Sequence, residues 1–157
     1  MEKKEENKKI LQSSLEYAIC KKEMMLYSVM GAILLAILTI LSMLVKSGRF
    51  FYLMIPFVML YIPMLLVKLH QMKNIVTDCE DILFCEAVLT DPQAGFNATN
   101  YFTVTIEDSN GKRFKAYTNA IAVSRGMVKP HYTKLNNKRA WIAYNRVTEQ
   151  VTVVKIL

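Results

Sequence analysis

Between residues 24 and 73 the sequence contains no aspartate or glutamate, although thirteen acidic residues occur in the chain. Apolar residues fill this stretch in two uncharged runs, 24–45 and 50–67. The core of a soluble domain would instead draw its apolar residues from the whole chain. The absence of acidic residues therefore argues against a single soluble domain and predicts a membrane segment.

Cysteine is also scarce. The three cysteines, Cys20, Cys79 and Cys85, are an odd number without the spacing of a zinc site, and a disulfide-rich scaffold would use more of them in a shorter chain. We expect reduced thiols facing the cytoplasm, with a Cys79–Cys85 disulfide as the alternative. We expect no metal and no other cofactor.

Catalytic constellations are missing as well. Nucleophilic catalysis needs a serine or cysteine beside a histidine and a carboxylate, and His131 is the only histidine in the second half of the chain. The five glycines form no phosphate-binding loop. The sequence therefore predicts a protein that is not an enzyme and offers no catalytic, cofactor-binding or metal-binding residue.

The two uncharged runs predict a helical hairpin. As helices they reach about 33 Å for residues 24–45 and about 27 Å for residues 50–67. A hydrocarbon core is about 30 Å thick, so the second run spans it if Lys68 snorkels and Leu69 contributes. Only residues 46–49 connect the runs, so the helices must be antiparallel neighbours. A cleavable signal peptide is the alternative for the first run, but that run is too long and its leader mixes Glu with Lys.

Basic residues near the runs set the expected orientation. Six lysines flank the runs on the side of the chain termini, and two basic residues lie in the connecting loop. The flanking residues are Lys8, Lys9, Lys21, Lys22, Lys68 and Lys73, and those of the loop are Lys46 and Arg49. The positive-inside rule then predicts a multi-pass protein of the cell membrane with both termini in the cytoplasm.

Small residues recur every three or four positions along the first helix, at Ser28, Ala32, Ala36 and Thr39. Such a face lets a neighbouring backbone approach closely, which stabilises helix pairs in lipid. We therefore expect these residues to pack against another helix. The favoured partner is the chain's own second helix, and another subunit is the alternative.

The sequence divides into four parts. We expect a cytoplasmic N-terminal helix over residues 1–23, the transmembrane hairpin over 24–69, a juxtamembrane linker helix over 70–80 and a soluble β-domain over 81–157. Apolar residues at helical spacing, with no Gly or Pro among them, support the N-terminal helix.

Alternating apolar and polar residues, rich in β-branched and aromatic side chains, predict strands in the last part. The expected strands are Ile82–Leu89, Tyr101–Glu107, Arg113–Asn119, Ala140–Tyr144 and Val151–Ile156. Asn110-Gly111 predicts a two-residue type I′ turn between the second and third strands. The expected fold class is an α+β membrane protein, in which a two-helix transmembrane hairpin precedes a small five-stranded antiparallel β-barrel or sheet of OB or SH3-like type.

Three segments of the β-domain carry a resemblance: an "AV" strand, "YFTVTIEDSNGKRFKAYT" and "AWIAYNRVTEQVTVVKI". They resemble the cytoplasmic β-barrel modules behind transmembrane helices in small bacterial membrane proteins, such as the nodulation-efficiency protein D group and several uncharacterised families. The resemblance covers residues 82–157 and rests on strand pattern and one turn. It carries over no functional residue, and it implies a membrane-tethered adaptor or assembly role.

Most of the net charge of +7 lies around the apolar runs, because residues 74–157 carry ten basic and eight acidic side chains. A nucleic-acid-binding domain would itself hold the excess, so nucleic acid is not the expected partner. A basic rim remains on the β-domain, formed by Lys112, Arg113, Lys115, Lys129, Lys134, Lys138 and Arg139. We expect the rim to face anionic lipid headgroups or a protein partner, with binding of single-stranded nucleic acid as the alternative.

These observations predict a membrane-anchored, non-enzymatic interaction or assembly module. Its hairpin contacts the lipid bilayer and supports self-association, and its β-domain binds a protein partner. The alternative is a subunit of a small oligomeric channel or transporter with β-domains around the cytoplasmic mouth. A charged residue within a span would favour that alternative, and neither run contains one.

Overall fold

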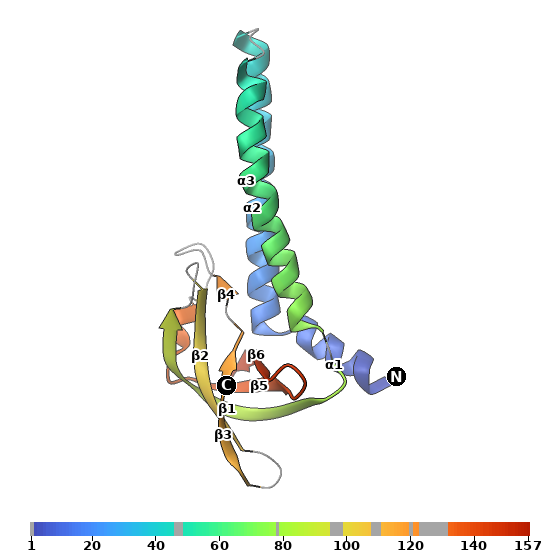
Figure 1. Ribbon diagram of the computed structural model, residues 1–157, viewed down its shortest axis with the longest axis vertical. Coiled ribbons are helices and arrows are strands. Elements are labelled where there is room, and N and C mark those ends of the chain that lie inside the picture. The colour runs from blue at the N-terminus through green and yellow to red at the C-terminus, as the bar shows by residue number, and fades with distance from the viewer. Residues whose placement is uncertain are drawn as a thin grey trace.

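The computed structural model describes residues 2–45, 49–77, 79–94, 99–107, 111–119, 121–122 and 132–157. Its helices are α1 (Glu2–Gln12), α2 (Leu15–Val45) and α3 (Arg49–Ile75), with a short 3-10 helix, η2 (Tyr132–Leu135). Its strands are β1 (Ile82–Ala94), β2 (Thr99–Glu107), β3 (Arg113–Thr118), β4 (Ile121–Ala122), β5 (Arg139–Asn145) and β6 (Gln150–Ile156). The chain is therefore an α+β protein, in which two long helices rise from a β-sheet (Figure 1).

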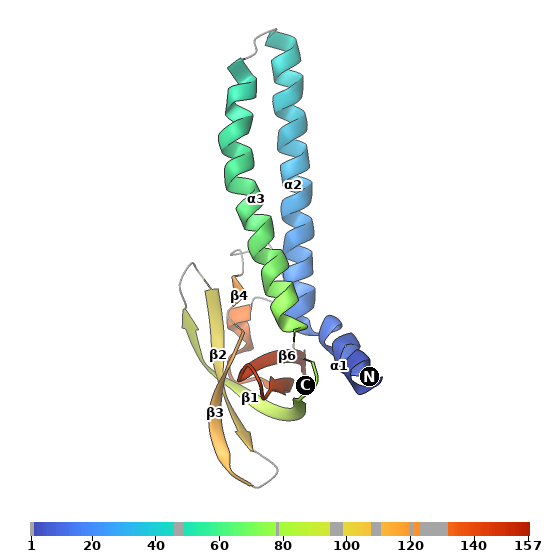
Figure 2. The same cartoon turned by 45° about the vertical axis from the view of Figure 1, so that its right-hand side comes forward.

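The long helices α2 and α3 lie side by side, as the two views in Figures 1 and 2 show. Both are long and apolar enough to cross a membrane. Only 6% of the most apolar window of α2 and 11% of that of α3 is buried within the protein. A core helix of a soluble domain buries most of its apolar side chains, whereas these two helices leave theirs uncovered.

The segment before the first apolar run is two helices rather than the single predicted one. Ser14 Oγ accepts a hydrogen bond from the Tyr17 backbone N–H at 3.2 Å, as a helix N-cap does. Ser13 Oγ donates to the Ile10 carbonyl at 2.8 Å. Serine side chains compete for backbone hydrogen bonds, so this pair ends α1 and begins α2 without Gly or Pro.

All five predicted strands are present, and the two-residue β4 is a sixth. Hydrogen-bonded neighbours follow the order β1-β5-β6-β3-β2-β4. β3 and β6 are parallel, with Thr118 opposite Val151, while the other pairings are antiparallel. The prediction of an antiparallel sheet was therefore wrong, because the long connection through β4, η2 and β5 brings β6 back in the direction of β3.

The long strand β1 has two partners. Its first half pairs with β5, where Ile82 lies opposite Asn145, and its second half pairs with β2, where Leu89 lies opposite Val104. The order β1-β5-β6-β3-β2 thus returns to β1. Alternate residues of these strands form the buried core, which includes Leu89, Phe102, Val104, Ile106, Ile142, Val151 and Val153.

The hairpin of β2 and β3 is confirmed, but its turn differs from the prediction. Glu107 pairs with Arg113, so residues 108–112, an odd number, lie between these two partners. A two-residue loop would leave an even number of residues between any two partners. Asn110 itself lies outside the described residues. Gly111 has φ +74°, which fits a longer loop that ends on a left-handed glycine.

Candidate functional site: the junction between the helices and the sheet

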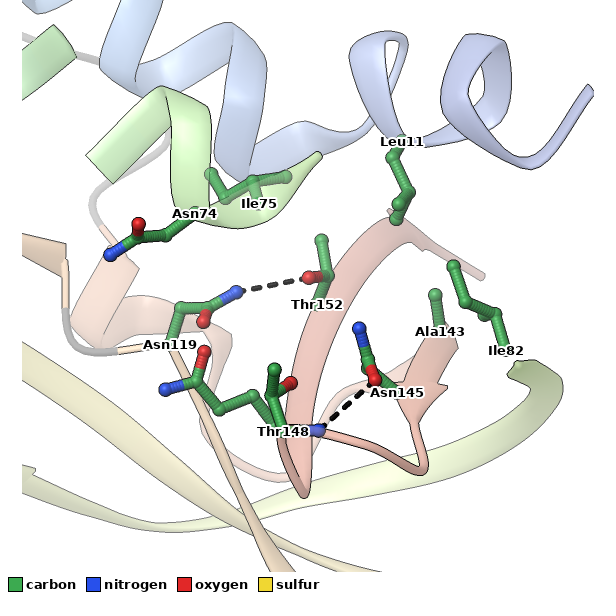
Figure 3. Close-up of a pocket in the computed structure, with 10 residues that line it drawn as sticks. Leu11, Asn74, Ile75, Ile82, Asn119, Ala143, Asn145, Thr148 and Thr152 are labelled. Carbon is green, nitrogen blue, oxygen red and sulfur yellow. Dashed lines mark hydrogen bonds between the residues drawn. The ribbon is translucent and has the colours of Figure 1, made fainter. Parts of the chain in front are cut away.

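The lower ends of the long helices meet the sheet at a junction that also includes α1 (Figures 1 and 3). Leu11 of α1 and Ile75 of α3 line it together with Ala143 of β5 and Thr152 of β6. Leu11 and Ile75 are 2% and 5% exposed. The apolar side of α1 is thus covered by the protein itself.

A buried carboxylate connects the long helix α2 to the sheet. Glu16, in the first turn of α2, is fully buried and accepts a hydrogen bond from Asn119 Nδ2 at 2.8 Å. The same nitrogen donates to Thr152 Oγ1 at 2.9 Å, so both of its hydrogens are used. Figure 3 shows the contact between Asn119 and Thr152. We call Glu16, Asn119 and Thr152 the polar junction; it connects α2, the end of β3 and β6.

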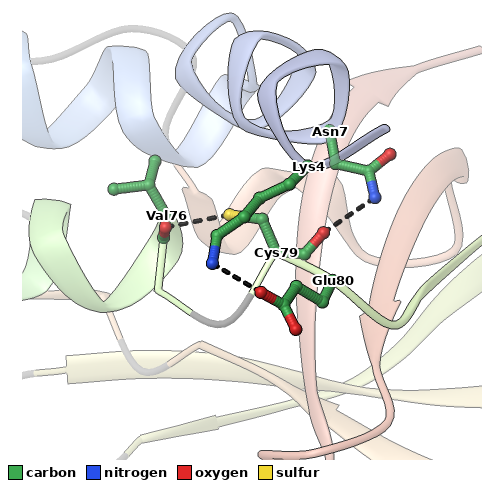
Figure 4. Close-up of polar contacts among 5 residues, drawn as sticks. All are labelled: Lys4, Asn7, Val76, Cys79 and Glu80. Atoms are coloured by element: carbon green, nitrogen blue, oxygen red, sulfur yellow. Dashed lines mark hydrogen bonds and ion pairs between the residues drawn. The ribbon is translucent and has the colours of Figure 1, made fainter. Parts of the chain in front are cut away.

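The first helix is attached to the segment between α3 and β1 by a second set of contacts (Figure 4). Asn7 Nδ2 donates to the Cys79 carbonyl at 2.8 Å in a buried position. Lys4 Nζ donates to Glu80 Oε1 at 2.6 Å on the surface, and this ion pair lowers the pKa of Glu80. Cys79 Sγ donates to the Val76 carbonyl at 2.9 Å. Residues far apart in sequence therefore hold α1 in place.

The space enclosed at the junction is small. Its volume is about 10 Å³, which holds about one water molecule. Polar side chains such as Asn74, Asn145 and Thr148 contribute to its lining. The junction is therefore a structural connection and has no room for an organic ligand.

A buried ion pair joins the two long helices close to the junction. Lys68 Nζ pairs with Glu23 Oε2, and the two side chains are 5% and 0% exposed. A span that extends to Lys68 was expected to require this side chain to snorkel, whereas in the structure the side chain is buried against Glu23. An isolated buried ammonium is costly, and Glu23, the last charged residue before the first apolar run, supplies the opposite charge.

Higher along the hairpin, an aromatic side chain of α3 packs directly against a glycine of α2. A Cβ added to Gly31 of α2 would lie 2.3 Å from Cζ of Tyr61 of α3. The Tyr61 hydroxyl donates to the Tyr27 carbonyl at 2.7 Å. Gly31 therefore leaves space for a phenol ring that hydrogen-bonds across the hairpin, a contact that the sequence analysis missed.

The predicted small-residue face points elsewhere. Ser28, Ala32 and Ala36 are exposed and Thr39 is half-buried. The Ser28 and Thr39 hydroxyls donate to the carbonyls of Met24 and Leu35 in their own helix. The chain's own second helix is thus not the partner of the exposed residues, and packing against another subunit stays a prediction.

The described residues of the predicted basic rim lie in two separate places. Lys112, Arg113 and Lys115 lie at β3, and Arg113 pairs with Glu107 at 2.9 Å. Arg139 is the first residue of β5 and pairs with Glu86 at 2.6 Å. Tyr144, near the other end of β5, lines a pocket together with Lys112. Arg139 and Lys112 are therefore near opposite ends of this strand. Lys134 and Lys138 are exposed near that start of β5, and Lys129 lies outside the described residues.

The arrangement offers little for chemistry. Within the described residues there is no group of three or more His, Cys, Asp or Glu side chains that could hold a metal ion. The three cysteines form no disulfide; Cys20 and Cys79 are buried, and burial raises the pKa of the half-buried Cys85. His70 is exposed on α3, and His131 lies outside the described residues.

Comparison of the chain with models of known protein families, with curated proteins and with solved structures found no match.

Proposed function

We propose that this chain is a membrane-anchored, non-enzymatic interaction or assembly module, with the hairpin in the cell membrane and the β-domain presented to a protein partner in the cytoplasm. The observation that carries the proposal is the polar junction, which fastens an uncovered apolar hairpin to the sheet through the fully buried Glu16. A simple tether needs only a flexible linker. A fixed attachment instead holds one face of the β-domain at a set orientation to the bilayer.

We include in this proposal that the sheet is a closed, OB-like barrel. The return of the strand order to β1 supports closure, and small five-stranded barrels of this kind present their outer strands and loops to ligands. The resemblance to modules of the nodulation-efficiency protein D group points to the same architecture. A barrel of this kind is a common carrier of binding surfaces and fits a module without catalytic groups.

The proposed orientation follows from the basic residues on the terminal side of both spans. Buried Cys20 and Cys79 are poor reporters of topology, so new cysteines are needed. We expect Ser47→Cys, in the connection between the helices, to react with a membrane-impermeant maleimide in intact cells. Lys134→Cys, on the β-domain, is expected to react only after permeabilisation. Labelling of Lys134→Cys in intact cells would reverse the proposed orientation.

Partner binding is testable by site-specific photocrosslinking in native membranes. A benzophenone amino acid is placed at Tyr117 or Val147, whose side chains are 54% and 67% exposed on the β-domain, and at Ile33, 55% exposed on α2, as the matched hairpin control. We expect discrete adducts with another protein from the β-domain positions, and no adducts other than self-adducts from Ile33. If adducts instead form a ladder of self-multiples from Ile33, and none arises on the β-domain, the channel or transporter alternative is correct and the proposal is wrong.

A further inference from the structure

The foot of the hairpin is the part where the start of α2 and the end of α3 lie side by side above the sheet (Figure 2). Three lysines are exposed there, Lys21 and Lys22 of α2 and Lys73 of α3, and we call them the juxtamembrane lysines. The two helices are antiparallel, so residues before Glu23 and residues after Lys68 lie on the same side of the ion pair that joins these two. That side faces the sheet.

The acidic residues of this part of the chain are turned away from its surface. Residues 13–77 contain only two, Glu16 and Glu23. Both are fully buried; Glu16 belongs to the polar junction with the sheet, and Glu23 pairs with Lys68. The sequence of residues 13–23 mixes charges of both signs, but its exposed charges are all positive.

The acidic residues that follow α3 have cations of their own. Glu80 pairs with Lys4 at 2.6 Å, and Asp81 pairs with Arg146 at 3.7 Å. Asp78 lies outside the described residues. These carboxylates are therefore compensated by residues other than the juxtamembrane lysines.

The first helix has its charges arranged in the same sense. Its exposed acids Glu5 and Glu6 lie in the half away from α2, whereas Lys9 lies in its last turn, next to α2. Within the part of the chain that the structure describes, the juxtamembrane lysines have no ion-pair partner. Their charge is therefore open to an anion from outside the chain.

The juxtamembrane lysines lie at the level of lipid headgroups when the hairpin spans a bilayer. The uncharged run 24–45 begins two residues after Lys22, a rise of about 3 Å, and the run 50–67 ends six residues before Lys73, a rise of about 9 Å. The headgroup layer on each side of the hydrocarbon core is about 5–8 Å thick. A lysine side chain extends along a helix toward this layer, so headgroup phosphates are within its reach.

We propose that the juxtamembrane lysines bind the headgroups of anionic phospholipids, so that the hairpin selects these lipids over zwitterionic ones. Cations next to a span are attracted to anionic lipid, and the attraction grows with each lysine. The inference rests on the membrane placement in the proposed function and adds a lipid class as a partner. The contacts that bury Glu16 and Glu23 thus have two consequences: they fix the hairpin to the sheet and they leave its foot purely cationic.

The test uses the full chain in a mild detergent with an equimolar mixture of phosphatidylglycerol and phosphatidylcholine of matched acyl chains. Native mass spectrometry reports which lipid is bound. We expect the wild type to bind phosphatidylglycerol roughly tenfold more tightly at low salt. Lys21→Gln/Lys22→Gln should reduce this preference to roughly threefold, and the further change Lys73→Gln should nearly abolish it. Glutamine is a good helix former, so α2 and α3 are retained.

Two control variants separate charge at the foot from other effects. Lys112→Gln/Lys115→Gln removes two exposed lysines from the hairpin of β2 and β3, the part farthest from the tip of the long helices in Figure 2. It is expected to keep the wild-type preference. Lys21→Arg/Lys22→Arg preserves the charge and should keep it as well. High salt should weaken the preference of the wild type, because exposed charges are screened.

Four results would overturn the inference: equal binding of the two lipids by the wild type, an equal loss from the variant of the β2–β3 hairpin, an equal loss from the arginine variant, or a preference that high salt leaves unchanged. If the photocrosslinks at Tyr117 and Val147 form in spite of such a result, the proposed function stands. Extraction of the wild type from membranes by alkaline carbonate is the result that removes the membrane anchor, and with it the proposed function.

Discussion

The helical hairpin and the β-sheet use the same apolar residue types in opposite ways. On α2 and α3 the isoleucines, leucines and methionines are largely exposed, with Ile33 at 55% and Leu44 at 74%. In the sheet Leu89 and Ile142 are fully buried. The sheet provides its own apolar environment by pairing strands around a core, whereas the hairpin leaves that role to its surroundings.

The ion pairs show the opposite distribution, being exposed in the sheet and buried between the helices. The ion pairs of the sheet, such as Arg139 with Glu86, are on the surface, while the pair of Glu23 and Lys68 in the helices is buried. Surface pairs contribute little to stability, but a buried charge that loses its partner is strongly destabilising. The helices therefore depend on a few polar contacts and the sheet on many apolar ones.

The largest expected effect tests this dependence directly. Lys68→Met leaves the buried Glu23 without its cation and is expected to lower the free energy of unfolding by about 3–5 kcal/mol. Thermal unfolding in detergent measures the change. Lys73→Met, which removes an exposed lysine of the same helix, is the control. The double variant Glu23→Leu/Lys68→Met should recover most of the loss, and a double variant as unstable as Lys68→Met would show that the ion pair is not the cause.

The second prediction compares one substitution in the two regions. Ile142→Ala opens a cavity in a fully buried site and is expected to cost about 2–5 kcal/mol. Ile33→Ala removes the same atoms from an exposed position on α2 and is expected to change stability by less than about 0.5 kcal/mol. Thermal unfolding and limited proteolysis measure both variants. Equal losses would mean that Ile33 packs against a further helix under the conditions of the measurement.

The contrast also explains which features were predictable. Strand positions follow from alternation along short segments, and all five predicted strands are present. The parallel pairing of β3 and β6 depends on residues more than thirty positions apart, such as Thr118 and Val151, and no local pattern encodes it. The burial of Glu16 and Glu23 was not predictable, since a helix pattern does not reveal a partner such as Asn119, which lies in the β-domain.

The helix contact illustrates a similar limit. Small residues occur at Gly31 and at Ala32, but successive residues point about 100° apart on a helix. The spacing of Ser28, Ala32 and Ala36 favoured a face that is exposed in this chain rather than the face that contacts α3. The contact at Gly31 is set by the phenol of Tyr61, which is thirty residues away. Gly31, the single glycine of the first apolar run, was the signal available in the sequence.

The third prediction separates the two faces of α2. Gly31→Val displaces the Tyr61 ring and breaks its hydrogen bond to Tyr27, so we expect a loss of about 1–3 kcal/mol. Ala32→Val adds bulk to the exposed face and is expected to leave hairpin stability unchanged. Proteolysis in detergent reports the hairpin contact, and crosslinking in membranes reports self-association. If Ala32→Val alone increases proteolysis, the assignment of the hairpin contact to Gly31 is wrong.

A smaller effect of opposite sign is expected in the sheet. Glu149, in the turn between β5 and β6, has φ +56°, a left-handed conformation that is unfavourable for a residue with a Cβ. Asn145 Oδ1 accepts hydrogen bonds from the Val147 and Thr148 N–H groups and holds the turn in this shape. Glu149→Gly is therefore expected to stabilise the protein by about 0.5–1 kcal/mol, whereas Thr148→Gly should not. Thermal unfolding of both variants distinguishes relief of strain from a general effect of glycine.

The smallest expected effect concerns the surface contact between the helical part and the start of the β-domain. Lys4 and Glu80 are 53% and 71% exposed, so solvent and salt screen their attraction. The pair nevertheless holds the pKa of Glu80 below its ordinary value of 4.5. An acid with a lowered pKa stabilises the folded state above its unfolded pKa, and this contribution is lost as the pH falls through the lower, folded value.

The difference in Tm between the wild type and Lys4→Met should consequently be small but present near pH 7, begin to shrink below pH 4.5 and vanish once Glu80 is protonated in both states. Lys9→Met, which removes an exposed lysine from the last turn of α1, controls for the loss of a positive charge. The difference should also decrease in high salt, since both side chains are exposed. A Tm difference that is constant over this pH range would show that Lys4 supports α1 through its aliphatic chain rather than through Glu80.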